Sequence, residues 1–534
     1  MMQRIAGAEW SMGGATSLTD IVAPAVSDVV APPITDIVAT LGGPTPREPA
    51  SSQPWLIVEV SDRPELLRAY HALRRREFVE LQGLFPRDDT DARDADSRTR
   101  VLTALSVDGR VLGGVRIHPA RDGSERIGWW QGSRLVVAAG IGAAGIGAAG
   151  GPRLSRGRIG SALVRAACAH ALDVGALRFD AQVQDRQLGF FERLGWEPVR
   201  AIEVAGASHQ LMRWPITRFQ ELVDATKQPL AGLIGSLLPD DRWRGDDGVP
   251  VPGGAGVVTC LDAITPSMVQ RDPEWAGWCG MLVTAHDLAA MGAAPAGALD
   301  ALAAPDRAHA SRVIDGVRAG ADALSLPVLG GHTQLGVPAA LSVTGVGHTL
   351  DPIPASGGRI GDAVTLTADV AGDWRPGYLG RQWDSSSWRT RDELAQMLST
   401  VARTRPHAAK DVSMAGVVGT LGMLAEASGC GAELDVGSIP RPSRTTLSDW
   451  LTCFPGMAML TCDEQGGRLP DAGAAVSATC GRLTAASGVR LRWPDGELTE
   501  ALAGDVSGLG AAGGRERGRD SDSSEHDHEP EMSR

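Results

Sequence analysis

The chain has 534 residues, a formal net charge of −13 and 43% hydrophobic residues, enough for about three or four compact domains. The negative charge argues against nucleic acid or an anionic membrane as a partner, because either would require a basic face. The seven cysteines form no Cys-x-x-Cys pair, which predicts reduced thiols and a cytoplasmic protein. The sequence contains no run of about 20 apolar residues, so we expect no membrane span.

Changes in composition and the positions of proline and glycine divide the chain into six parts. Residues 1–54 carry a Thr-Asp-Ile-Val-like echo between prolines and alanines, which predicts a disordered tail, with a docking peptide as the alternative. The charged, Ser-rich residues 509–534 predict a second disordered tail. Between the tails we expect domains at 55–215, 240–350 and 351–508, with a linker at 216–239.

The first domain opens with a helical pattern from Pro64 to Glu80. The runs Val101–Val107 and Arg110–His118 predict a hairpin that turns at Asp108-Gly109 in a type I′ geometry. A strand is expected at Arg134–Val137, and the Gly-Ile-Gly-Ala-Ala repeat that follows predicts an inserted loop.

A possible anion site lies at the start of the next helix. Residues Arg156 to Ser161 (Arg-Gly-Arg-Ile-Gly-Ser) directly precede a strong helix-forming run. Small residues at a helix N-terminus leave backbone N–H groups open, and together with the helix dipole they favour a diphosphate. A tight turn into a helix is an equally good explanation of this pattern taken alone.

The segment Phe190 to Val199 (Phe-Phe-Glu-Arg-Leu-Gly-Trp-Glu-Pro-Val) strengthens the first interpretation. Together with the helix start, it resembles the GNAT family of acyl-CoA-dependent N-acetyltransferases, over about residues 57–215. The resemblance implies acetyl-CoA as cofactor, with the pantetheine arm beside Leu135 to Val137 and the pyrophosphate on the helix start. The cofactor-binding residues that it implies are Leu135, Val137, Arg156, Gly157, Arg158, Gly160 and Ser161.

Two departures from that family bear on activity. Ser155 stands where the family usually has Gln or Arg, which weakens the expected phosphate grip. Phe191 stands where many members carry a tyrosine that protonates the departing thiolate, and phenylalanine has no proton to give. A domain that binds CoA or serves only as structure is therefore the alternative to an active acetyltransferase.

The second half alternates strand-like and helical runs, which predicts two α/β subdomains. Helices are expected near Trp275–Met291 and His309–Leu324, and a second αβ unit is expected to begin at Asp362. The expected strands are Val257–Leu261, Gly297–Leu302, Pro327–Leu329 and Leu341–Val346.

Four acids in this half are spaced for a metal and nucleotide site. Mg²⁺ prefers oxygen ligands and reaches nucleotide phosphates through a few carboxylates. We therefore expect Asp246, Asp247, Asp262 and Asp287 to bind Mg²⁺. The alternatives are a turn or helix cap for Asp246 and Asp247 and a strand-end cap for Asp262, whereas Asp287 lies in an apolar helical context where an uncompensated carboxylate is costly. The segment Leu329 to Thr333 (Leu-Gly-Gly-His-Thr) is expected as a flexible loop beside them.

In this order the motifs resemble the superfamily of aminoimidazole ribonucleotide (AIR) synthase, selenophosphate synthetase and thiamin-monophosphate kinase, over about residues 240–505. The most specific segment is Asp287 to Ala293 (Asp-Leu-Ala-Ala-Met-Gly-Ala), and the segments beginning at Arg359 and Lys410 fit the second subdomain. The resemblance implies a PurM-like fold with Mg²⁺ and ATP as cofactors, nucleotide contacts at Gly330, Gly331 and Thr333, and a homodimer.

Three further residues are candidates for catalysis: His332, Lys410 and Asp411. His332 stands where several superfamily members have an acid, while Lys410 and Asp411, with His407, are equally a solvated charged turn.

The order of the two modules resembles AIR synthase-related fusion proteins of nitrilase-linked gene clusters, with a mixed α/β and α+β multidomain fold. We expect a bifunctional enzyme that N-acylates an amine and uses Mg-ATP to phosphorylate a carbonyl or amide oxygen of a small molecule. The alternative is one ATP-dependent enzyme with a non-catalytic N-terminal domain. A third possibility, two binding modules without catalysis, predicts no phosphate release.

Overall fold

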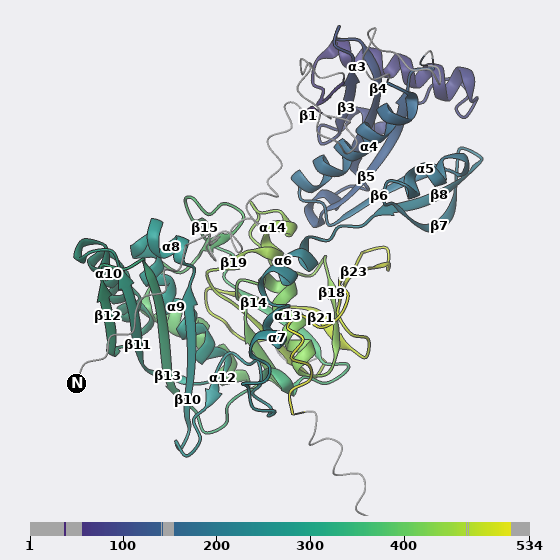
Figure 1. Cartoon of the computed structure of the whole chain (residues 1–534). Coiled ribbons are helices and arrows are strands. Elements are labelled where there is room, and N and C mark those ends of the chain that lie inside the picture. Colours follow the sequence, from purple (N-terminus) through teal and green to yellow (C-terminus); the bar gives the residue numbers. More distant parts are fainter. Residues whose placement is uncertain are drawn as a thin grey trace, which may run out of the picture.

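The computed structural model describes residues 37–38, 56–139, 141, 154–465, 467 and 469–513. Most of both expected tails and of the Gly-rich loop after residue 139 lie outside these residues. Figure 1 shows an N-terminal sheet domain joined to a larger body that holds the second and third sheets. None of the helices in the described ranges is long and apolar enough to cross a membrane.

The N-terminal sheet has eight strands in the order β1-β2-β3-β4-β5-β6-β8-β7. Its helices are α3 (Pro64–Arg74), η1 (Arg75–Leu81), α4 (Arg156–Asp173) and α5 (Leu188–Glu192), and α4 packs on the inner strands. The strands are β1 (Ile37–Val38), β2 (Ile57–Val60), β3 (Arg100–Leu105), β4 (Val111–Pro119), β5 (Trp129–Val137), β6 (Arg178–Gln184), β7 (Glu197–Val204) and β8 (Ala207–Trp214).

The β3–β4 hairpin forms where the sequence predicts it, but its turn is not of type I′. Gly109 has a φ of 78°, whereas Asp108 is not among the residues with positive φ. The Gly109 N–H donates to the Ser106 carbonyl (2.8 Å), and the Ser106 N–H donates to the Arg110 carbonyl (3.0 Å). The loop is therefore a turn closed by a left-handed glycine, and the register shift at Leu105 accommodates the extra residue.

The second sheet has the order β12-β11-β13-β10-β9 and is covered on one face by α9 and α10. Helix α9 is buried on nearly all sides, as its apolar composition requires. The elements are β9 (Val249–Pro250), β10 (Val257–Ile264), α8 (Pro266–Arg271), α9 (Pro273–Ala290), β11 (Ala294–Ala304), α10 (Arg307–Leu324), β12 (Val328–Leu335) and β13 (Ala340–His348).

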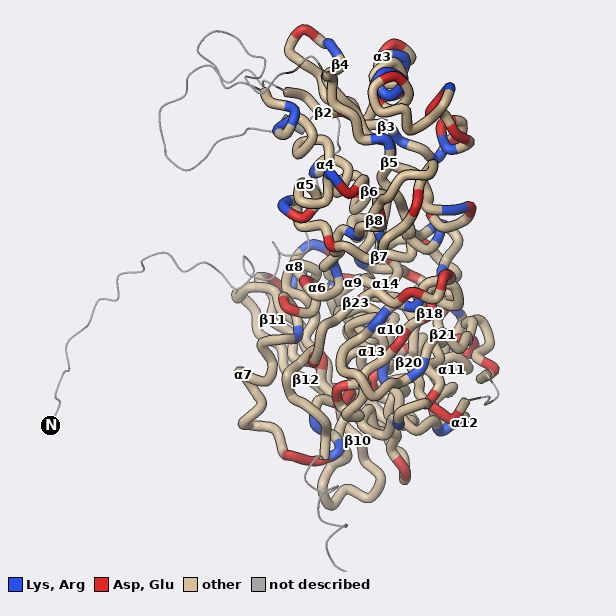
Figure 2. Tube along the Cα trace, turned by 90° about the vertical axis from the view of Figure 1, so that its right-hand side faces the viewer, with Lys and Arg blue, Asp and Glu red and all other residues tan. Residues whose placement is uncertain are grey.

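The opposite face of this sheet is open within the described chain. Leu261, Leu299 and Leu329 are exposed on β10, β11 and β12, and every residue of β12 is exposed. The traces of β11 and β12 are mostly tan in Figure 2, which marks them as nearly free of charge. A sheet face that exposes leucines on three of its strands is typical of an association surface.

The third sheet has the order β17-β20-β14-β21-β18-β22-β23, with α13 against it and a small sheet β15-β16-β19 beside it. Its helices are α11 (Arg391–Leu398), α12 (Thr400–Thr404), α13 (Gly416–Ala427) and α14 (Leu447–Thr452). The strands are β14 (Ala363–Ala368), β15 (Asp373–Trp374), β16 (Gln382–Asp384), β17 (Ala408–Asp411), β18 (Gly431–Asp435), β19 (Phe454–Pro455), β20 (Ala458–Asp463), β21 (Val476–Thr484), β22 (Val489–Arg492) and β23 (Leu498–Leu502).

The segment expected as a linker is helical and packed. It contains α6 (Arg218–Thr226) and α7 (Leu230–Ile234), and Phe219 and Val223 of α6 belong to the hydrophobic core of the third sheet. Figure 1 shows α6 close to α13. Because α6 buries an apolar face against α13, this segment has a fixed course past the second and third sheets.

Candidate functional site

Three aspartates from separate segments meet between the second and third sheets. Asp247 precedes β9, Asp287 lies in the last turn of α9, and Asp411 ends β17. One carboxylate oxygen from each lies within 4.8 Å of the other two. The Asp287 and Asp411 side chains are buried. Carboxylates gathered this closely away from water repel one another, so they require cations or protons.

The electrostatics of the group reflect this repulsion. Burial raises the pKa of the Asp287 carboxyl well above its usual value, and Asp411 and Asp262 raise it further. Burial also raises the pKa of the Asp411 carboxyl, with the Asp247 carboxylate as the next cause. Either protons or a bound cation would relieve this repulsion.

Asp262 adds a fourth carboxylate beside Asp287. It lies on β10, and burial raises the pKa of its carboxyl. Its Oδ2 atom is buried and has no hydrogen-bond partner among the described residues. A buried oxygen without a donor, next to three more carboxylates, is the ligand chemistry that a divalent cation such as Mg²⁺ uses. The residues present therefore fit a magnesium ion.

Lys410 pairs with one member of the group. Its ammonium contacts the Asp247 carboxylate and donates to the Gly245 carbonyl at 3.3 Å. The Asp411 backbone N–H donates to the other oxygen of Asp247 at 3.0 Å. Burial alone would lower the pKa of the Lys410 ammonium, but the Asp247 and Asp246 carboxylates raise it instead. Lys410 thus stays charged and positions Asp247.

Asp246 is not one of the three grouped residues. Its Oδ2 accepts the Ala355 N–H at 2.8 Å, and its Oδ1 accepts the Asp247 N–H at 2.9 Å. Burial raises the pKa of its carboxyl to about 7. These two hydrogen bonds join the start of the third domain to the turn that carries Asp247. Asp246 therefore fixes the position of this turn.

The Gly-Gly-His-Thr segment lies elsewhere, and the expectation that it forms a loop is wrong. Gly330, Gly331, His332 and Thr333 belong to β12, which pairs in parallel with β11 at the far edge of the sheet. Two strands separate β12 from β10, so at about 4.8 Å per strand spacing it lies roughly 14 Å from Asp262. The described chain does not bring these residues to its own carboxylate group.

The remaining candidates divide between two places. Asp411, expected to face the substrate, instead joins the metal-type carboxylates. His407 has its Nδ1 atom 3.0 Å from an oxygen of Asp362 and its Nε2 atom 3.6 Å from Asp463. It therefore engages two carboxylates of the third sheet rather than the three grouped aspartates.

The sequence analysis missed Lys227, which follows α6 in the segment expected as a linker. Its ammonium interacts electrostatically with Asp411, Asp262 and Asp247. The missed signal was compositional: the chain's 51 basic residues comprise 49 arginines and two lysines, Lys227 and Lys410.

A second site opens in the N-terminal sheet. Strands β5 and β6 pair in parallel only over Trp129–Gly132 and Arg178–Ala181. Beyond that point lies a cavity of about 480 Å³. Its lining includes five of the residues predicted for acetyl-CoA: Leu135, Val137, Arg156, Gly157 and Gly160. Arg158 and Ser161 are not among the described residues that line it.

The start of α4 is partly satisfied by its own residues. Ser155 is the N-cap, and its hydroxyl accepts the Arg158 N–H at 3.3 Å. The Arg156 guanidinium donates to the Val137 carbonyl at 3.1 Å and lies 3.6 Å from Glu77. Above Gly157 there is open space, because an added Cβ atom would meet only the Ser155 hydroxyl, at 4.0 Å.

The cavity has no tyrosine to act as an acid. Phe191 is buried, with its ring edge-on to Trp196. The chain has only two tyrosines. Tyr70 is buried, and its hydroxyl donates to the Arg134 carbonyl at 2.9 Å, while Tyr378 belongs to the larger body. Proton donation by tyrosine, the role expected at position 191 in active relatives, is therefore absent.

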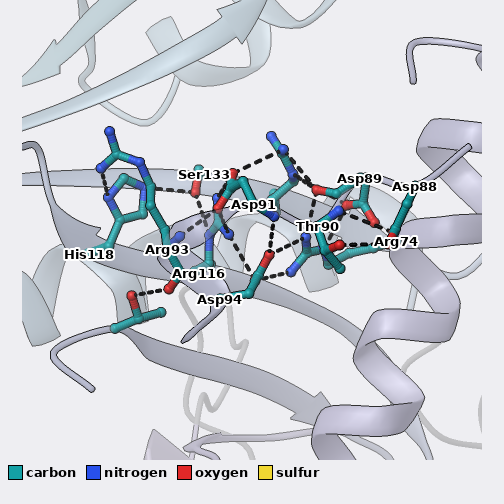
Figure 3. A network of polar contacts seen from close by, with 12 residues as sticks. Arg74, Asp88, Asp89, Thr90, Asp91, Arg93, Asp94, Arg116, His118 and Ser133 are labelled. Atoms are coloured by element: carbon teal, nitrogen blue, oxygen red, sulfur yellow. Dashed lines mark hydrogen bonds and ion pairs between the residues drawn. The ribbon is translucent and has the colours of Figure 1, made fainter. Parts of the chain in front are cut away.

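A buried ionic network lies behind one wall of this cavity, where the Arg116 guanidinium donates to the hydroxyl of the lining residue Ser133 at 3.0 Å (Figure 3). The Arg74 guanidinium donates to Asp89 at 2.7 Å and to Asp94 at 2.6 Å. The Arg116 guanidinium donates to both oxygens of Asp91, at 2.7 and 2.8 Å. Both arginines are fully buried. Paired and hydrogen-bonded charges of this kind fix the geometry of the segments that carry them.

The fold and the carboxylate group define a two-domain α/β module built around an acidic site. Two family models match it: AIR synthase related protein, N-terminal domain, over residues 245–349, and AIR synthase related protein, C-terminal domain, over residues 384–488. An uncharacterised protein of Synechocystis sp. is 32% identical over 250 residues, 45% of this chain and 76% of that protein. The chain belongs to the AIR synthase-related family.

Two further similarities concern proteins with a named activity. The thiamine-monophosphate kinase of Rhodopirellula baltica is 32% identical over 191 residues, which are 34% of this chain and 57% of the kinase. A solved structure of AaThiL complexed with AMPPCP and TMP has a TM-score of 0.41 and 21% identity, covering 50% of this chain and 93% of that one. The two family models stop short of the N-terminal sheet, and these relatives give no support to the acyltransferase and acetyl-CoA predictions.

Proposed function

We propose that the chain is one Mg-ATP-dependent enzyme of the AIR synthase-related family, which phosphorylates a carbonyl or amide oxygen of a small molecule. The observation that carries the proposal is the group of Asp247, Asp287 and Asp411, with the unpartnered oxygen of Asp262 beside it. In the reaction, a bond forms between the substrate oxygen and the γ-phosphorus, while the bond to the β–γ bridging oxygen breaks and its electron pair leaves with ADP. An amide that reacts through oxygen also loses a nitrogen-bound proton to a base, and a carbonyl compound loses a proton from the α-carbon to give an enol phosphate.

The chain's own residues would align and neutralise rather than react covalently. Asp247, Asp262, Asp287 and Asp411 would hold Mg²⁺, and Lys410 would keep Asp247 in place. When bound, the metal supplies positive charge to the phosphate oxygens. Gly330, Gly331 and Thr333 remain proposed nucleotide contacts, but only from a second copy of the chain. The open face with Leu261, Leu299 and Leu329 favours such a homodimer, and sedimentation of the full chain measures it.

The test of the ATP-dependent function is the variant Asp287→Asn. Its loss of one carboxylate charge should weaken Mg-ATP binding at least tenfold, because a ligand at the centre of the group is removed. Isothermal calorimetry of the full chain with Mg-ATP measures this. The matched control is Asp315→Asn, an exposed aspartate on α10, which should bind like the unmodified chain. Unchanged affinity in Asp287→Asn would remove the metal role of this residue.

We further propose that the N-terminal cavity binds coenzyme A without catalysing acyl transfer. Support comes from the five lining residues shared with the predicted cofactor contacts and from the open space above Gly157. Phe191 and the lack of a cavity tyrosine favour binding without transfer. A titration of acetyl-CoA, followed by an assay for its hydrolysis or transfer, separates this proposal from a bifunctional enzyme.

A further inference from the structure

The two lysines of this chain, Lys227 and Lys410, lie at the same site in the fold. Of the 51 basic side chains, 49 are arginines spread over all domains, and both lysines border the carboxylate group. Lysine differs from arginine in carrying a compact point charge on a flexible stem. Lysine stands at these two positions and arginine at all other basic positions. We infer that the site requires a compact ammonium on a flexible stem.

Lys227 is held in place by the helix that precedes it. Its backbone N–H donates to the Val223 carbonyl at 2.8 Å at the end of α6. Val223 packs close to Gly419 of α13, where a Cβ atom added to the glycine would lie 3.2 Å from the valine methyl. Helix α13 starts five residues after Asp411. The packing of α6 on α13 therefore brings Lys227 to the carboxylates of the second and third sheets.

The two lysines are bound differently. The Lys410 ammonium is occupied by Asp247 and by the Gly245 carbonyl. The Lys227 ammonium is repelled by Lys410 and attracted by Asp411, Asp262 and Asp247 through space, yet among the described residues it has no ion-pair partner within 4.0 Å. Asp262 and Asp411 in turn feel the charge of Lys227. A half-buried cation that faces anions without pairing with them is available to a further anionic group.

We propose that Lys227 is the cation that contacts the terminal phosphate of the bound nucleotide, while Lys410 stays paired with Asp247. This inference rests on the proposed ATP-dependent function. An ammonium cannot bind the metal directly, and unlike Lys410 the Lys227 ammonium has no ion-pair partner among the described residues. A cation beside the transferred phosphoryl group offsets the charge that its oxygens carry during transfer.

The binding test compares nucleotides with and without a terminal phosphate. The full chain and its Lys227→Met, Lys227→Arg and Arg318→Met variants are titrated with Mg-ADP and with Mg-AMPPCP. Lys227→Met should weaken Mg-AMPPCP about tenfold or more, the effect of removing one hydrogen bond between charged groups, and Mg-ADP less than about threefold. Lys227→Arg should retain part of the affinity, and Arg318→Met, at an exposed site on α10, all of it. Equal losses for both nucleotides, or no loss, overturn the inference.

A second readout follows the unmodified chain and uses a variant only to assign its signals. Labelling the full chain with ¹³Cε-lysine gives two lysine signals, which Lys227→Arg assigns. Mg-AMPPCP should shift the Lys227 signal strongly, Mg-ADP less and Mg²⁺ alone least. If the unmodified chain binds no Mg-nucleotide, the proposed function itself fails. If it binds Mg-AMPPCP while the Lys227 signal stays unchanged, only the role of Lys227 is overturned.

Discussion

The carboxyl groups of Asp287 and Asp411 bind protons more tightly than usual because they lie buried beside other carboxylates. Burial and neighbouring carboxylates raise the pKa of both groups above the usual aspartate value, and burial raises that of Asp246 to about 7. In each case the folded chain holds protons more tightly than the unfolded chain. Stability from these groups is therefore present at low pH and lost as the pH rises through the folded-state pKa.

Magnesium should reverse this loss. Without metal, thermal stability should fall between about pH 4, the unfolded aspartate pKa, and the folded-state value, which is about 7 for Asp246. Mg²⁺ competes with the protons, so its stabilisation, about 2.7 kcal/mol at a hundred times Kd, should be larger at pH 8 than at pH 5. Melting curves at the two pH values with and without Mg²⁺ measure it. An equal shift at both pH values, or none, would contradict a shared metal and proton site.

At the scale of elements, helix α4 offers a sharp test of the coenzyme A proposal. Gly157 is the second residue of α4 after the Ser155 cap, and space above it is open. Gly157→Asp should leave the fold intact or stabilise the helix by up to about 1 kcal/mol, because its dipole favours a carboxylate there. The same charge should repel a pyrophosphate and weaken acetyl-CoA binding about tenfold or more.

The matched control places the same residue at the same helical position elsewhere. Ala308 is the exposed second residue of α10 after the Asp306 cap. Ala308→Asp should leave the calorimetric affinity for acetyl-CoA unchanged. If Gly157→Asp binds acetyl-CoA as well as the unmodified chain does, the pyrophosphate is not at the start of α4.

Most helices and strands could be predicted from the sequence, but the elements against which they pack or pair could not. Hydrophobic periodicity located α9, α10 and the β3–β4 hairpin within a few residues, because local spacing reports a buried face. The pattern Gly-Gly-His-Thr suggested a loop, and pairing with β11 made it a strand. The segment 216–239 was expected to be a linker, although Phe219 and Val223 bury α6 against α13. In both cases tertiary contacts decided the structure.

The same limit applied to the acidic site. Asp247, Asp262 and Asp287 were predicted from motifs near one another in the chain, whereas Asp411 lies more than a hundred residues away and Lys227 precedes the motifs. Only the packing of the third sheet and of α6 brings these two to the others. Asp246 was predicted as a ligand because it adjoins Asp247, but neighbouring residues in a turn point differently, and its oxygens accept backbone N–H groups.

At the scale of the whole molecule, the N-terminal sheet is fixed to the third sheet. The Arg178 guanidinium donates to Asp495 at 3.0 Å and to Glu497 at 2.9 Å, and Trp129 packs against Trp493 with ring centroids 6.1 Å apart. Because Arg178 lies on β6, which also borders the cavity, the cavity has a fixed position relative to the acidic site.

The most direct test of the magnesium site is a crystal of the full chain grown with Mn²⁺ and AMPPCP. Manganese takes the same oxygen ligands as magnesium and gives an anomalous signal. The anomalous map should show a peak bound by the carboxylates of Asp247, Asp287 and Asp411, with the nucleotide phosphates beside it. A bound nucleotide whose metal lies away from these three residues would contradict the proposed site.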